Sequence, residues 1–163
     1  MPTISPSLWF DGNAQEAVGF YTRVFPNSSI LRTSYFGPGT PGPEGEVMAI
    51  DFELDGRPFN AINGGPQFPF TEAVSFAVLC GDQAEVDHYW FGLSADGGQE
   101  VQCGWLKDRF GVSWQVVPRV LGELIADPDP GRRDRATQAL LGMKRLVIAD
   151  LLKAADGNET DGN

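Results

Sequence analysis

Apolar and polar residues alternate most clearly between positions 46 and 54. Met48, Ile50, Phe52 and Leu54 fall on one face of an extended segment, and Val47, Ala49, Asp51 and Glu53 fall on the other. A period of two residues is the pattern of a β-strand with one buried face. The sequence therefore predicts a strand at 46–54, with Met48, Ile50, Phe52 and Leu54 together on its apolar face.

The next residues predict a hairpin. Asp55-Gly56 favours the tight turn that joins two antiparallel strands. The segment 57–63 then returns as the partner strand, and Gly64-Gly65-Pro66 ends it.

A second pattern, with apolar residues three or four positions apart, predicts helices. It runs from Ala14 to Phe25, where Pro26 stops it. Asp11 or Asn13 is placed to cap the free N–H groups at the start of this helix.

The same order of elements occurs twice: a strand, a helix and three strands. The first half predicts strands at 4–10, 29–36, 46–54 and 57–63, and the second half at 73–80, 99–105, 106–110 and 112–118, with a helix capped by Asp82 after its first strand. Such a repeat of architecture indicates two modules, at 3–66 and 72–118, which can pair to build one curved sheet. The fold class predicted is α+β.

After Pro118 the pattern becomes helical. It predicts an extension over 119–155, which completes a single domain at 1–155, and a disordered polar tail at 156–163. Its apolar residues must be covered, either by the chain itself or across a dimer. They are Leu121, Leu124, Leu140, Met143, Leu146 and Leu151.

Charge and composition exclude several classes of function. The net charge of −10 opposes binding to nucleic acid or to an anionic membrane, because it repels phosphate. No apolar run approaches the roughly 20 residues that a membrane span needs, and the N-terminus lacks a signal-peptide pattern, so we expect a cytoplasmic protein. Cys80, Cys103 and His88 suggest neither a disulfide framework nor a zinc cluster, and buried thiols are expected.

The stretch from Cys103 to Pro118 is the first place to look for a ligand. Its strand puts Trp114 and Val116 on one face and Ser113, Gln115 and Val117 on the other. The second face therefore carries a hydroxyl and an amide.

Two neighbouring segments are expected to be surface features. Lys107, Asp108 and Arg109 are interpreted as a solvated hairpin turn. The Gly/Pro-rich segment 37–45 is interpreted as a mobile loop that could cover a pocket as a lid.

Several segments resemble one family. SLWFDGNAQEAVGFYTRVFPNSSI, INGGPQFPF, AVSFAVLC, VDHYW and GWLKDRFGVSWQVVP are similar to the PhnB-like family of the vicinal oxygen chelate (glyoxalase/bleomycin-resistance) superfamily. This resemblance covers residues 4–152. It implies paired βαβββ modules that form an incomplete barrel around a cavity, and a homodimer.

Members of this family often carry the label 3-demethylubiquinone-9 3-methyltransferase domain. A Rossmann-type methyltransferase needs a Gly-rich turn after its first strand, and here that strand is followed by Asp11-Gly12-Asn13. The label is therefore treated as a family name.

The resemblance also implies four positions where metal-dependent superfamily members place ligands. Here they fall at Pro6, at Asn60 or Asn63, at Ser75 and at Gln115. Apart from Gln115 these are poor ligands for a divalent transition metal, so we expect no catalytic metal and no cofactor.

The function expected is binding of a small organic ligand in a homodimer cavity. The alternatives are a metal-dependent lyase or dioxygenase, with Asp51, Glu53 or Glu100 turned inward, and the methyltransferase of the family label. The residues expected to line the pocket are Leu8, Phe10, Asn63, Ser75, Ala77, Ser113 and Gln115, with Phe59 and Trp105 at its rim.

Each pocket candidate also has a structural explanation. Asn63 can belong to a turn, Gln115 can satisfy backbone groups, and aromatic residues on strands commonly build a core.

Overall fold

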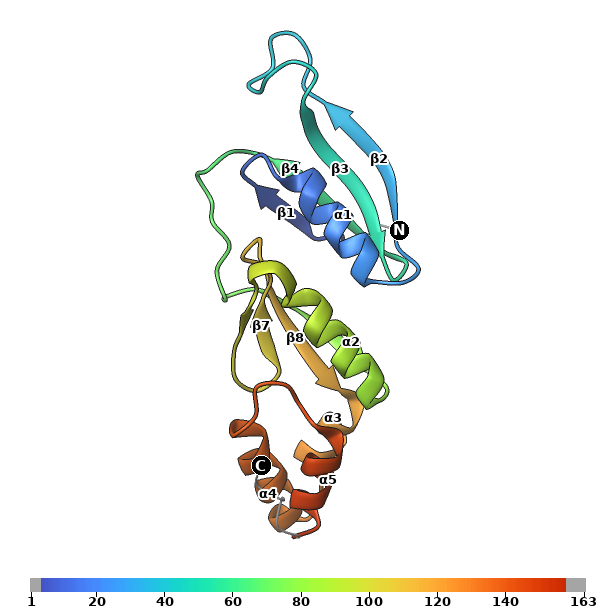
Figure 1. Ribbon diagram of the computed structural model, residues 1–163, viewed down its shortest axis with the longest axis vertical. Helices are drawn as coiled ribbons and strands as arrows, with labels where there is room; N and C mark the ends of the chain where they lie inside the picture. The colour runs from blue at the N-terminus through green and yellow to red at the C-terminus, as the bar shows by residue number, and fades with distance from the viewer. Residues whose placement is uncertain (1–3, 158–163) are drawn as a thin grey trace. The chain divides into compact units, whose positions relative to one another are not determined.

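The computed structural model describes residues 4–157, which divide into two compact units at the boundary between Phe70 and Thr71. Each unit contains one βαβββ module, as the sequence predicts, and the second unit also carries the helical extension (Figure 1). The boundary lies in the short segment predicted to join the modules. Whether the chain acts as a single domain stays a prediction.

Unit 1 builds a mixed four-stranded sheet, called sheet A, with one helix packed on it. Its strand order is β1-β4-β3-β2, in which β1 runs parallel to β4 and the other pairs are antiparallel. The elements are β1 Ser7–Phe10, α1 Ala14–Val24, β2 Ser29–Tyr35, β3 Val47–Leu54 and β4 Arg57–Asn63.

The core of unit 1 lies between α1 and one face of sheet A. Val18 and Tyr21 of α1 are fully buried, and Ile50, Phe52 and Leu54 of β3 are nearly so. This confirms the alternation predicted for the strand. Burial of each such side chain stabilises the fold by about 1.5–3 kcal/mol relative to its exposure to water.

The hairpin between β3 and β4 also forms as predicted. Asp55 and Gly56 both have positive φ angles, 49° and 70°, as a two-residue turn of the primed type requires.

The start of α1 differs from the prediction. Asn13 occupies the N-cap position, but its side chain makes no capping hydrogen bond. The cap comes instead from Asn63 at the end of β4, whose Oδ1 accepts from the backbone N–H of Ala14 at 2.9 Å. Asn63 Nδ2 donates to the carbonyl of Val47 and to Gln15 Oε1, each at 2.9 Å. This one amide therefore joins α1, β3 and β4.

Unit 2 repeats the arrangement in a second sheet, called sheet B. Its strand order is β5-β8-β7-β6, with β5 parallel to β8. The elements are β5 Ser75–Cys80, α2 Gln83–Leu93, the short 3₁₀ helix η1 Ala95–Gly97, β6 Gln99–Glu100, β7 Trp105–Lys107 and β8 Ser113–Pro118.

The helix α2 covers the face of sheet B that carries Trp114 and Val116, both buried. Asp82 caps α2 as predicted, because its carboxylate accepts from the N–H of Glu85 at 2.9 Å. Cys80 is buried, and burial raises the pKa of its thiol to about 12.

The strand predicted at 99–105 is shorter than expected. Only Gln99–Glu100 pair with β7, because Cys103 and Gly104 adopt positive φ angles of 61° and 81°. Their N–H groups donate to the carbonyls of Met143 and Lys144, at 2.7 and 2.8 Å. This turn binds the helical extension to the module, and Cys103 is half-buried there.

The extension consists of α3 Arg119–Ile125, α4 Pro130–Leu141 and α5 Ile148–Ala155. It has a core of its own, formed by Leu121, Leu124, Ala136, Leu146, Leu151 and Ala155, with Leu140 and Met143 packed against it. The apolar residues predicted to need a cover are therefore packed within the chain. They give no support to a dimer.

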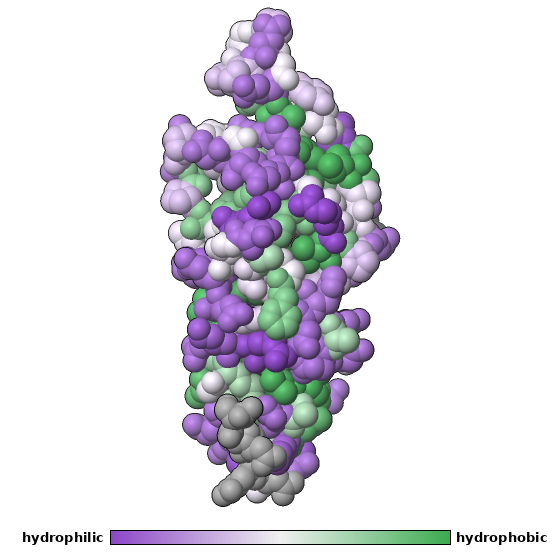
Figure 2. Space-filling model, viewed as in Figure 1, coloured by the Kyte–Doolittle hydropathy of each residue, from purple (hydrophilic) through white to green (hydrophobic). Residues whose placement is uncertain are grey.

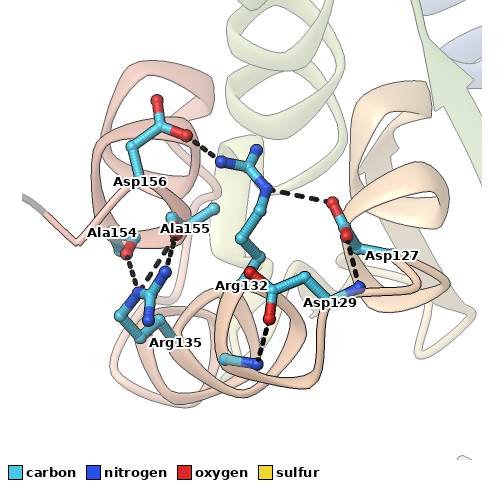
Figure 3. A network of polar contacts seen from close by, with 8 residues as sticks. Asp127, Asp129, Arg132, Arg135, Ala154, Ala155 and Asp156 are labelled. Carbon is cyan, nitrogen blue, oxygen red and sulfur yellow. Dashed lines mark hydrogen bonds and ion pairs between the residues drawn. The ribbon is translucent and has the colours of Figure 1, made fainter.

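Hydrogen bonds and ion pairs join residues at the ends of α3, α4 and α5 (Figure 3). Arg132 pairs with Asp127 after α3 and with Asp156 after α5. Arg135 donates to the carbonyls of Ala154 and Ala155 at the C-terminus of α5. Asp156, assigned to the tail by the sequence, belongs to this network, and residues 158–163 of the predicted disordered tail lie outside the described residues.

Hydrophilic residues cover most of the face shown in Figure 2, with apolar side chains between them. None of the helices within residues 4–157 combines the length and the hydropathy of a membrane span.

The cap on α1 generates the first prediction. Asn63→Ala should lower the free energy of unfolding by about 2 kcal/mol, because it removes the cap and leaves the Val47 carbonyl without this donor. Asn13→Ala should change it by less than about 0.5 kcal/mol. Urea denaturation of both variants measures the difference, and equal losses would contradict the assignment of the cap to Asn63.

Candidate functional site

Polar side chains form a row across the face of sheet A that is turned away from α1. Arg32, Asp51, Asn60 and Ser7 are direct cross-strand neighbours on β2, β3, β4 and β1. Ser7 Oγ donates to Asn60 Oδ1 at 2.9 Å, and Asn60 Nδ2 donates to Asp51 Oδ1 at 2.8 Å. Arg32 Nε completes the row with a hydrogen bond of 2.9 Å to Asp51 Oδ2.

The row in sheet A is a closed hydrogen-bond network. The amide of Asn60, followed by the guanidinium of Arg32, holds the pKa of Asp51 below its ordinary value. Each of the four side chains already has a hydrogen-bond partner within the row, so the row offers a ligand no unsatisfied polar group.

The corresponding row in sheet B is incomplete. Gln99, Lys107, Ser113 and Ser75 are direct cross-strand neighbours on β6, β7, β8 and β5. Ser75 Oγ accepts from Gln115 Nε2 at 2.9 Å, and Lys107 forms an ion pair with Glu72. Ser113 lies between them, 2% exposed, and its Oγ has no hydrogen-bond partner.

The next row on the same face adds an aromatic ring. Trp105, Gln115 and Ala77 are cross-strand neighbours on β7, β8 and β5. Sheet B therefore brings together five of the residues predicted to line a pocket, on the face turned away from α2. They are Ser75, Ala77, Trp105, Ser113 and Gln115.

A buried carboxylate holds the turn between β7 and β8 in shape. Asp108 is 3% exposed, and its Oδ1 accepts from the N–H groups of Phe110 and Val112 at 2.8 and 3.0 Å. Its Oδ2 accepts from Trp114 Nε1 at 2.9 Å. The interpretation of residues 107–109 as a solvated turn was therefore wrong for Asp108. Its contacts fix where β8 begins and hence the position of Ser113.

The pocket residues predicted in unit 1 lie on the other face of their sheet. Leu8 and Phe10 are buried on the side of sheet A that α1 covers, and Phe59 stacks on buried Phe52 with ring centroids 5.5 Å apart. Asn63 also points to α1, as the capping contacts show. These four residues therefore build and brace the core, which corrects their assignment to a pocket.

Two further residues, Ser7 and Trp9, lie on the face of β1 turned away from α1, which the sequence-based prediction did not choose. Because Ser7 and Trp9 alternate with Leu8 and Phe10 along β1, a prediction that placed the pocket on the opposite face of this strand would have included them. Trp9 Nε1 donates to the carbonyl of Gly65 at 2.8 Å, and its ring meets Phe68 edge to face. Glu72, the ion-pair partner of Lys107, lies in the segment before β5, and no sequence pattern there indicates a functional residue.

The donors at the four metal positions are a poor fit to a divalent transition metal. The carbonyl of Pro6 accepts from the N–H of Asn60, and the side chains of Ser75 and Gln115 bond to each other. Asn60 is the amide on the face away from α1, and it is held by Ser7 and Asp51. All of these donors are neutral, and residues 4–157 contain no group of three His, Cys, Asp or Glu side chains suited to a metal.

The two βαβββ modules define the fold of the glyoxalase/bleomycin-resistance superfamily. The chain belongs to its PhnB-like family, because residues 2–117 match the family model described as 3-demethylubiquinone-9 3-methyltransferase. No curated protein is similar enough to this sequence to count as a match. The helical extension lies beyond the matched residues.

Solved structures agree with this assignment. The PhnB protein of Bacillus cereus, whose description names the same methyltransferase, is 34% identical with a TM-score of 0.65, and the match covers 72% of this chain and 99% of that one. The fosfomycin resistance protein FosX of Listeria monocytogenes, solved with Mn(II) and sulfate, is 16% identical with a TM-score of 0.53 over 77% of this chain and 95% of its own. A protein of Pseudomonas aeruginosa is 23% identical with a TM-score of 0.60 over 72% of this chain and 98% of its own. The last two show the fold alone.

The network in sheet A generates a prediction about the pKa of Asp51. Asn60→Ala should raise this pKa, because the amide is the largest cause of its depression. A carboxylate with a depressed pKa contributes stability above its unfolded pKa, and this stability is lost as the pH falls through the folded pKa. The variant should therefore lose less stability than the parent on acidification below about pH 4.

Carbon-detected NMR titration of the Asp51 carboxyl measures this pKa. Glu53→Gln is the control, because it removes a charge from the same strand without touching the network. An unchanged Asp51 pKa in Asn60→Ala would contradict the account.

The buried carboxylate generates a third prediction. Asp108→Asn should lower the free energy of unfolding by about 3 kcal/mol, because the amide cannot accept from Trp114 Nε1 and from both backbone N–H groups. Asp134→Asn, at a largely exposed position on α4, should change it by less than about 0.5 kcal/mol. Urea denaturation followed by tryptophan fluorescence measures both, and a small effect at Asp108 would refute its role.

Proposed function

We propose that the protein binds a small organic molecule on the face of sheet B turned away from α2, without a resident catalytic metal. The observation that carries the proposal is the buried hydroxyl of Ser113, which has no hydrogen-bond partner. An unmet buried hydroxyl costs about 1–3 kcal/mol, so a ligand atom that bonds to it gains that free energy.

The neighbours of Ser113 suit such a ligand. Trp105 supplies a half-buried aromatic surface, and Gln115 supplies an amide that Ser75 holds in place. A mainly apolar site with a few fixed polar groups is typical of small-molecule recognition.

Catalysis by a bound metal is less well supported. Of the acidic residues considered as alternative ligands, Asp51 is held by Asn60 and Arg32, and Glu100 accepts from Trp90 Nε1 at 2.8 Å. Glu53 alone does not make up a metal site.

The methyltransferase named by the family has one observation in its favour, the family match itself. Both sheets mix parallel and antiparallel strands, unlike the doubly wound parallel sheet that serves nucleotide cofactors in Rossmann-type enzymes. A shift in the melting temperature with S-adenosylmethionine would favour the methyltransferase over the binding protein.

A homodimer in the cytoplasm is part of the proposal, and it rests on the family resemblance alone. Light scattering in dilute solution tests it, and the mass of a single chain, 17.7 kDa, would refute the dimer.

The test of ligand binding uses 3-phenylpropanamide, an uncharged molecule with a ring and a hydrogen-bonding end. It should bind in the presence of a chelator with a Kd of about 1 mM, as expected for a ligand of this size. Two-dimensional ¹H–¹⁵N NMR should show saturable shifts of the Gln115 side-chain amide.

A matched pair of variants locates the binding. Ala77→Trp fills the face beside Gln115 and should abolish the shifts, whereas Ala149→Trp on α5 should preserve them. Absence of saturable binding, or equal loss in both variants, would overturn the proposal.

A further inference from the structure

We infer that the ligand is a small aromatic acid whose oxyanion binds between Ser113 and Lys107. This inference rests on the proposed function and adds the chemical class of the ligand. It comes from comparison of the polar rows in the two sheets, which occupy corresponding positions in the two modules.

The row in sheet A contains its own anion. Asp51 sits in the third strand of the module, and its carboxylate is the acceptor to which Asn60 and Arg32 both donate. The position that corresponds to Asp51 in unit 2 is Lys107, which pairs directly with Ser113 as Asp51 pairs with Asn60. The row in sheet B therefore has a donor where the row in sheet A has an acceptor.

In the row of sheet B, one hydrogen-bond donor has no acceptor, and another has an acceptor that comes from outside the sheet. Ser113 Oγ has no partner, and the Lys107 ammonium is held by Glu72, a residue outside the sheet. The side chain of Glu72 is 64% exposed, and an exposed ion pair of this kind contributes little to stability. A carboxylate from a ligand can replace Glu72 on Lys107 and accept a hydrogen bond from Ser113 at the same time.

Access to the hydroxyl requires a side chain to move, because Ser113 is buried. Its neighbour in the row is Lys107, whose side chain is 28% exposed and is paired with the more exposed Glu72 outside the sheet. Opening of this ion pair would admit the ligand. The hydrogen bond from Lys107 is the main cause that lowers the pKa of Glu72, so the group that a ligand must displace is a charged carboxylate.

The second row sets the shape of the ligand. Trp105 and Gln115 lie two residues along their strands from Lys107 and Ser113, a distance of about 7 Å. A ring against Trp105 and an acid group at Lys107 therefore need a short spacer between them. The strand residues on this face carry one charged side chain, that of Lys107.

The experiment compares 3-phenylpropionate with 3-phenylpropanamide, which has the same shape without the charge. The acid should bind about tenfold more tightly at neutral pH and low salt, since charge-assisted hydrogen bonds are stronger than neutral ones. Lys107→Gln and Ser113→Ala should each remove most of this advantage, whereas Lys144→Gln, which removes an exposed lysine of the extension, should leave it. Glu72→Gln should strengthen binding of the acid, because it removes the competing carboxylate.

The outcomes separate this inference from the proposed function. Equal affinity for acid and amide would overturn the inference and leave the proposed function standing, and failure of both probes to bind would overturn both. An advantage of the acid that survives Lys107→Gln would also overturn the inference. Thermal unfolding checks that each variant is folded, and Glu72→Gln, on an exposed residue, provides a test that does not depend on changes inside the sheet.

Discussion

The parallel pairing of the first strand with the last strand in each module determines which side chains share a face. In unit 1 this register places Ser7 beside Asn60 and Leu8 beside Ala61, and in unit 2 it places Ser75 beside Ser113. A slip of one residue would exchange the core face for the polar face along a whole strand. The helix of each module covers the apolar face, so the polar rows on the other face follow from the same register.

Two polar side chains, half-buried Asn63 and buried Asp108, hold this arrangement, and each does so with several hydrogen bonds. Asn63 bonds to α1 and β3, and Asp108 bonds to three N–H groups around the start of β8. A polar side chain is tolerated in a core when its hydrogen bonds are met, and it then favours one arrangement over others. The Ser113 hydroxyl lies next to this ordered turn without a hydrogen-bond partner, which is why the proposed binding site is centred on it.

The sequence predicted the elements that depend on local pattern. The alternation at 46–54, the Asp55-Gly56 turn, the Asp82 cap and the faces of β8 are all as expected, because neighbouring residues decide them. The cap of α1 by Asn63 spans 49 positions of sequence, and no local pattern can show such a contact. The choice of face on β1 failed for a related reason, since both Leu8/Phe10 and Trp9 are apolar and alternation alone did not decide between them. Asp108 was misread because charged residues between two strands commonly lie in solvent.

Charge at the candidate site differs from that of the whole molecule. The net charge of −10 creates a field that opposes the approach of polyanions, and this field is screened beyond about 8 Å at physiological ionic strength. Lys107 acts at contact distance, where a direct hydrogen bond outweighs the screened field of distant carboxylates. A small acid with one negative charge is repelled only weakly by the distant carboxylates and can still form the hydrogen bond to Lys107. A nucleic acid or an anionic membrane carries many negative charges, and each of them is repelled. The proposed ligand, a small acid, is therefore compatible with the acidic surface of the molecule, which disfavours larger anions.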